Sequence, residues 1–129
     1  MPRRPLAALR SLAAVARAAV RVGFHERRRS LPDLVRLLRS TPRDPACDPI
    51  LSLAALERLL PLLPPYGAGR CVKRSLLLLD LWSRAGVAPS LHLGLRGTAN
   101  DRIGHAWITT REPGLETYRP PDVVEAFRA

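Results

Sequence analysis

The stretch that most constrains the fold is residues 71–84, CVKRSLLLLDLWSR, an expected helix that is apolar on almost every side. A helix without a polar face is packed on several sides, so we expect this one at the centre of the molecule. Gly86 follows it as a natural C-terminal stop. The large apolar side chains of this helix are Leu76, Leu77, Leu78, Leu79, Leu81 and Trp82.

The first turn of the same helix carries a cysteine among three cations. Cys71 is flanked by Arg70, Lys73 and Arg74, although the helix dipole favours carboxylates at an N-terminus. The positive end of a helix and neighbouring cations both stabilise a thiolate, the nucleophilic form of cysteine. The pattern therefore indicates a reactive Cys71. The alternative is a packing role, because a lone cysteine in an apolar helix is usually buried.

Three further helices are expected before this one. Residues 5–22 form an Ala/Leu-rich helix, and a second helix is expected to begin with Ser30 as its N-cap. Residues 41–49 contain three prolines and predict a loop. Residues 50–63 predict the third helix, which Pro61 ends or kinks.

The periodicity changes from helical to alternating after the central helix. Residues 89–97 alternate Leu with His and Gly and predict a strand with one buried face, which leaves His92 facing solvent. Residues 102–110 predict a second strand and residues 115–119 a third. A short helix is expected within residues 120–129. Helices followed by a small antiparallel sheet indicate the α+β class.

The 129 residues suffice for one domain, which we expect over residues 1–129. We expect residues 1–65 to form its helical N-terminal region and residues 66–129 to form the core that carries Cys71. Two cysteines do not make a disulfide framework in a domain of this size. The apolar N-terminal segment is interrupted by arginines, so it fits neither an export signal nor a membrane span. We expect a cytoplasmic protein.

The formal charge of +10 is concentrated in the N-terminal third of the chain. Residues 1–45 hold 11 Arg and 3 acidic residues, a balance of +8, whereas residues 46–129 hold 10 basic and 8 acidic residues, a balance of +2. A basic face attracts an acidic peptide, a nucleic acid or an anionic membrane surface. Aromatic residues make up only 5% and no binding motif is present, which argues against nucleic acid. Five arginines recur at intervals of 7 or 4 and share one helical face: Arg3, Arg10, Arg17, Arg21 and Arg28.

A thiolate at a helix start becomes a catalyst when a histidine can reach it. His105 lies 34 residues after Cys71, inside an expected strand with the sequence GHAW. A metal site would need clustered Cys and His at short spacings, which the scattered Cys47, His92 and His105 do not provide, so no metal is expected.

Three ordered motifs within residues 69–110 resemble the transglutaminase-like leader peptidases of lasso-peptide biosynthesis. The sequence reads RCVKRSLLLLDLWSRAGVAPSLHLGLRG and, after a turn, GHAWITT. The family pattern is an R-C-x-x-R-S-L opening, a G-[IV]-x-x-x-L-x-[IL]-G-[VL]-R strand and an H-A-W strand.

The resemblance implies a papain-like core with a Cys-His-Asp triad and no cofactor. Cys71 would be the nucleophile and His105 the general base, with Trp107 in the core or the cleft wall beside them. Members of this family remove the leader from a ribosomally made precursor, so that a lasso cyclase can close the ring. The chain is too short to include a leader-recognition domain, so we expect a separate small recognition protein. Arg10, Arg17 and Arg21 are the candidate docking residues for the leader or this partner, although a solvated face is the simpler reading.

The third triad member departs from the family pattern. The family places an Asp about a dozen residues after the His, and counting from His105 leads to Thr117. If residues 113–114 form the tip of a hairpin, residue 105 lies opposite Asp122, which we favour. Glu116 is the rival by spacing, and a Cys-His dyad stays open. So do a non-catalytic scaffold and acyl transfer or amidase chemistry, which uses the same triad.

Overall fold

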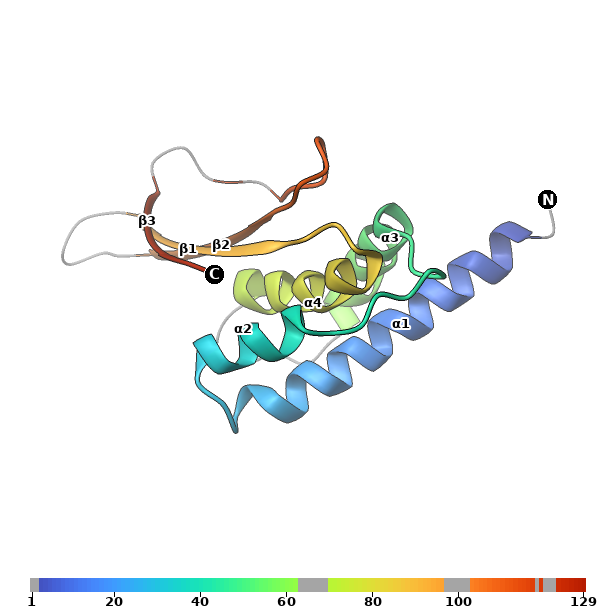
Figure 1. The fold of residues 1–129 in the computed structure, drawn as a ribbon, viewed down its shortest axis with the longest axis horizontal. Coiled ribbons are helices and arrows are strands. Elements are labelled where there is room, and N and C mark those ends of the chain that lie inside the picture. The colour runs from blue at the N-terminus through green and yellow to red at the C-terminus, as the bar shows by residue number, and fades with distance from the viewer. Residues whose placement is uncertain (1–2, 63–69, 97–102, 118, 120–122) are drawn as a thin grey trace.

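The structure is a computed structural model that describes residues 3–62, 70–96, 103–117, 119 and 123–129 (Figure 1). Helices come first along the chain and a three-stranded antiparallel sheet follows, which confirms the α+β class. The elements are α1 (Arg3–Glu26), α2 (Leu31–Arg39), α3 (Pro49–Leu59), the 3-10 turn η1 (Leu60–Leu62), α4 (Arg70–Ala85), β1 (Ser90–Arg96), β2 (Ile103–Thr109) and β3 (Val124–Arg128).

Helix α4 is the central element, as its apolar sequence predicts. It contacts α1, α2 and α3 as well as β1 and β2, and it lies between the other helices and the sheet (Figure 1). Its leucines and Trp82 are at most 1% exposed. Burying them removes on the order of 1.5–3 kcal/mol of unfavourable hydration per large side chain. Within the described residues, no helix is both long and apolar enough to cross a bilayer.

A buried ion-pair cluster ties α4 to the N-terminal helices. Asp80 of α4 is fully buried, and its Oδ1 accepts hydrogen bonds from Arg21 Nη1 of α1 at 2.9 Å and from Thr41 Oγ1 at 3.2 Å. Arg84 Nε lies 3.6 Å from the same oxygen. Because a buried carboxylate is costly unless it is paired, this cluster fixes α1 and the segment after α2 against the central helix.

The sheet has the strand order β2-β1-β3, so β1 is its middle strand. In β1, Gly94 pairs with His105 of β2 on one side and with Glu125 of β3 on the other. The expected short helix in residues 120–129 is wrong, because Val124–Arg128 forms β3. Its register shifts between Leu93, which pairs with Phe127, and Gly94, which pairs with Glu125. Because of this bulge, Phe127 packs on the core while Glu125 bonds to His92 on the other face.

The expected strand in residues 115–119 is also not formed in the described part of that segment, residues 115–117 and 119. Only Thr117 bonds to β2, through its backbone N–H to Ile108 O at 3.0 Å and through its Oγ1, which accepts from Ile108 N at 2.8 Å. The chain then crosses over to pair with β1 instead.

Candidate active site

Cys71 lies in the first turn of α4 with its side chain exposed. Its Sγ donates a hydrogen bond to the backbone carbonyl of Ala106 in β2, at a distance of 3.6 Å. The thiol is therefore held at the helix start and against the strand that carries His105. The sequence analysis predicts the Cys-His pair at this junction between α4 and β2.

The cations around Cys71 have structural partners, which the sequence pattern did not reveal. Lys73 is 3% exposed and its Nζ lies 3.4 Å from Glu26 at the end of α1. Burial lowers the pKa of Lys73 below its usual 10.5, and the Glu26 carboxylate opposes this shift. Arg74 pairs with Glu57 of α3. These two cations anchor α4 to the helical layer rather than serving Cys71 alone.

His105 follows the alternation of β2. Ala106 and Ile108 are buried in the core beside α4, so His105 and Trp107 project from the opposite side of the strand. The Nε2 atom of His105 is buried and has no hydrogen-bond partner in the described part of the chain. The Cys71 thiol therefore bonds to Ala106, the residue after His105, but it makes no hydrogen bond to the His105 imidazole.

Asp122 and Glu116 are the two carboxylates predicted as the third member of the triad, and only Glu116 lies within the described residues. Asp122 lies outside the described residues. The register that led to it is wrong by two residues, because Thr117 lies opposite Ile108 rather than opposite residue 110. Glu116 is exposed, and among the described residues its carboxylate has no hydrogen bond to His105. The acid in register with His105 across the sheet is Glu125, beyond Gly94.

His92 belongs to a second cluster of polar side chains. The alternation of its strand predicts that His92 faces solvent, but the residue is only 6% exposed. Its ring stacks on Trp107 at 5.4 Å between ring centroids, Nε2 lies 2.7 Å from Thr109 Oγ1, and Nδ1 bonds to Glu125. The hydrogen bond from His92 is the main cause that lowers the pKa of Glu125 below its usual 4.5. His92 is covered because β3 and Trp107 border it, and neither contact can be read from the β1 sequence alone.

A pocket of about 610 Å³ opens beside this group. Glu116 lines it together with Trp107, so the cleft-wall position expected for Trp107 is on this side of the sheet. Arg119 lies over the Trp107 ring, with its guanidinium carbon 5.0 Å from the centroid. Among the described residues, no three His, Cys, Asp or Glu side chains gather as metal ligands.

The profile of one protein family, described as the Transglutaminase-like superfamily, matches residues 7–128. The chain belongs to the transglutaminase-like superfamily. A comparison with curated proteins and one with solved structures found no match. Superfamily membership agrees with the observed α+β fold, and many members of such a superfamily are cysteine hydrolases or acyltransferases.

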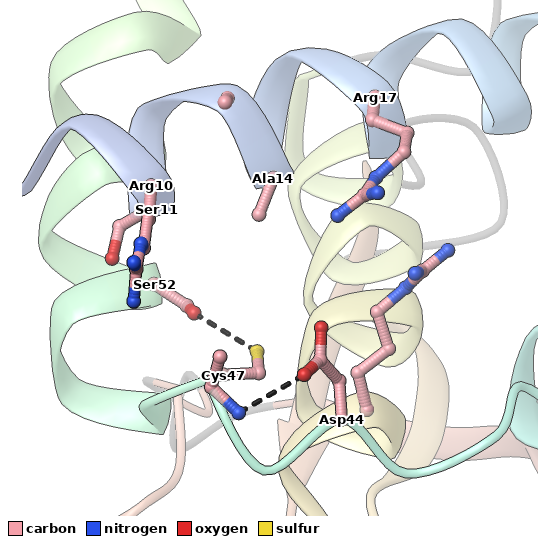
Figure 2. Close-up of a pocket in the computed structure, with 10 residues that line it drawn as sticks. Arg10, Ser11, Ala14, Arg17, Asp44, Cys47 and Ser52 are labelled. Atoms are coloured by element: carbon pink, nitrogen blue, oxygen red, sulfur yellow. Dashed lines mark hydrogen bonds between the residues drawn. The ribbon is translucent and has the colours of Figure 1, made fainter. Parts of the chain in front are cut away.

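The predicted docking arginines of this transglutaminase-like chain have two kinds of environment. Arg10 and Arg17 are exposed on α1 and point toward the loop that carries Asp44 and Cys47 (Figure 2). Arg21 is different, because its guanidinium bonds to Asp80 and its side chain is only 25% exposed. The shared helical face therefore divides into a structural arginine and two that line a pocket of about 400 Å³.

Proposed function

We propose that this chain is a cysteine peptidase that removes the leader peptide from a ribosomally synthesised lasso-peptide precursor in the cytoplasm. The observation that carries the proposal is the exposed Cys71 thiol at the start of the central helix, 3.6 Å from the carbonyl that follows His105. The superfamily supplies the chemistry, and the three lasso-peptidase motifs supply the substrate class.

In the proposed reaction, His105 takes the proton from Cys71 and the thiolate attacks the scissile carbonyl carbon. The backbone N–H of Cys71, at the helix start, donates to the oxyanion. The C–N bond then breaks, His105 returns the proton to the leaving amine, and an acyl-enzyme remains. Water hydrolyses the thioester with His105 as base, and no cofactor is required.

This mechanism needs the imidazole of His105 to reach the thiol, directly or through one water. Because His105 projects from the face of β2 opposite α4, the proposal requires this edge strand to turn at residue 105 until the ring faces Cys71. Catalytic hydrogen bonds often form fully only when the substrate is bound. Asp122 or Glu116 would then orient the second nitrogen of His105, and substituting each acid separately distinguishes them from a dyad.

The proposed partners are the precursor peptide and a separate small leader-recognition protein, with a lasso cyclase acting on the released core. Arg10 and Arg17 are the proposed docking residues, because their guanidinium groups have no ion-pair partner among the described carboxylates. Arg21 has a buried partner in Asp80, so it would contribute mainly to the fold.

A non-catalytic scaffold in the same pathway is the second candidate. It is favoured by one observation, the lack of a hydrogen bond between His105 Nε2 and any described residue. An acyltransferase or amidase would use the same residues as the peptidase and would differ in the acceptor of the acyl group.

The deciding experiment incubates the protein with precursor and recognition protein and follows the products by mass spectrometry. We expect leader release by the unaltered chain, none by Cys71→Ala, and nearly unchanged release by the matched control Cys47→Ala. Equal thermal midpoints for the two variants would show that the loss is chemical. Cleavage surviving in Cys71→Ala contradicts the assignment, and assembly without cleavage by any variant supports the scaffold.

A further inference from the structure

The pocket beside Cys47 is formed by elements that are distant in sequence. It has a volume of about 400 Å³ and lies between α1, the loop of residues 41–49, the start of α3 and the end of α4. Figure 2 shows the side chains of Arg10 and Arg17 reaching from α1 toward Cys47, Ser52 and Asp44. A hollow of this size accommodates a carboxylate side chain or a phosphate.

The charge of the pocket lining is unbalanced. Three guanidinium groups border it, those of Arg10, Arg17 and Arg84, against the single carboxylate of Asp44. That carboxylate already accepts the backbone N–H of Ala46 at 2.9 Å, which stabilises the loop turn. Arg84 has Asp80 as a partner at 3.6 Å, whereas neither Arg10 nor Arg17 pairs with a described carboxylate.

Two polar groups lie at the inner wall between these cations. Ser52 is 1% exposed, and its Oγ lies 3.5 Å from Cys47 Sγ. The Cys47 thiol also donates to Leu81 O at 3.4 Å, so it is fixed beside the cavity. Guanidinium groups bind carboxylate and phosphate oxygens through paired N–H donors. A small hydroxyl at the inner wall suits the same ligand.

We propose that this pocket binds an oxyanion, either the carboxylate of an acidic peptide side chain or a phosphate. The site is separate from Cys71. It rests on the docking role proposed for Arg10 and Arg17 and deepens it by naming the chemical group that these arginines hold. Because Cys47 lines this pocket, its thiol is a position from which ligand binding can be observed.

The test uses Cys71→Ala protein, in which Cys47 is the one remaining cysteine. Inorganic phosphate and a synthetic peptide of glutamates are titrated at constant ionic strength. The rate of Cys47 alkylation by iodoacetamide and the thermal midpoint are measured at each concentration. A bound anion should slow alkylation by covering the thiol and should raise the midpoint by mass action.

The variant Arg10→Gln/Arg17→Gln should weaken anion binding about a hundredfold, because it removes two charged hydrogen bonds and each costs about a factor of ten. The matched control Arg36→Gln/Arg39→Gln removes the same charge from exposed positions on α2 and should leave binding unchanged. Tighter binding of the peptide identifies a peptide-docking pocket, and tighter binding of phosphate identifies a small-anion site.

The proposal is overturned if neither anion shifts the midpoint or protects Cys47. It is also overturned if the two double variants bind equally well, which would mean that only net charge matters. Neither readout depends on precursor cleavage, so a failure here is distinct from a failure of the peptidase proposal. If Cys47 proves unreactive, the thermal midpoint decides alone.

Discussion

At Gly94 the backbone of β1 passes too close to its neighbours for any larger side chain. A Cβ there would come within 2.9 Å of Val124 O and 3.0 Å of Trp107 Cζ3, and it would overlap Val123. We predict that Gly94→Ala lowers the free energy of unfolding by about 2–3 kcal/mol, the usual cost of overpacking against backbone.

The matched control is Gly104→Ala in β2, where a Cβ would meet nothing within 4 Å. This change should alter the free energy of unfolding by no more than about 0.5 kcal/mol. Urea denaturation of both variants measures the difference. Equal stability of the two would mean that β1 and β3 are not packed as described.

A second prediction concerns the buried carboxylate of Asp80. Asp80→Asn leaves Arg21 with a neutral partner inside the helical layer, so we expect a loss of about 2–4 kcal/mol, near the cost of breaking a buried pair. Asp33→Asn breaks an exposed pair with Arg36 and should cost less than about 1 kcal/mol. A similar loss for both variants would contradict the structural role of the Asp80 cluster.

Single residues show clearly what sequence could and could not reveal. The position of Cys71 at the start of the central helix follows from local pattern, because helix periodicity and the apolar run lie within sixteen residues. The partners of Lys73, Arg74 and His92 come from α1, α3 and β3, so no local pattern contains them. Lys73 and Arg74 therefore have a role in packing the helices that the sequence around Cys71 could not reveal.

The start of α3 is capped by a side chain. The Asp48 carboxylate accepts from Ile50 N at 2.8 Å and from Leu51 N at 3.0 Å. We predict that Asp48→Ala costs about 1 kcal/mol of stability, because two backbone donors lose their acceptor. Ser30 occupies the N-cap position of α2 without a side-chain cap bond, so Ser30→Ala should cost much less. Thermal unfolding ranks the two, and a larger loss for Ser30→Ala would contradict the prediction.

At the scale of elements, helices were easier to predict than strands. A helix satisfies its hydrogen bonds within itself, so periodicity and prolines located α1 to α4 closely. A strand forms its backbone hydrogen bonds with another strand, and the last strand, β3, pairs with β1 rather than with β2. The hairpin register from which Asp122 was inferred also differs from the structure by two residues, because Thr117 lies opposite Ile108.

For the whole molecule, the contact between β1 and β3 makes folding pH-dependent. His92 holds the pKa of Glu125 below 4.5, so the folded state gains stability from this carboxylate above that pH. As the pH falls below 4.5 and then through the lowered pKa of Glu125, the carboxylate is protonated and this stabilisation of the folded state is lost. We predict that Glu125→Gln flattens the decline in stability on the acid side of the profile, measured by urea midpoints between pH 6 and pH 2.

The control for this profile is Glu112→Gln, since Glu112 is exposed and its side chain makes no hydrogen bond to a described residue. The stability of Glu112→Gln should fall with decreasing pH as steeply as that of the unaltered chain. If Glu125→Gln declines as steeply as the control, the His92 contact does not contribute to the stability of the folded molecule.

The two cysteines contact opposite ends of α4, and this separation decides how the protein responds to oxidation. Cys71 begins the helix, while the Cys47 thiol bonds to Leu81 O, ten residues further along. Ten helical residues span about 15 Å, whereas a disulfide needs Cα atoms within about 7 Å. Oxidants therefore cannot close a loop within one folded molecule. We expect them instead to join the exposed Cys71 to a small thiol or to a second chain, and a reductant should reverse both products.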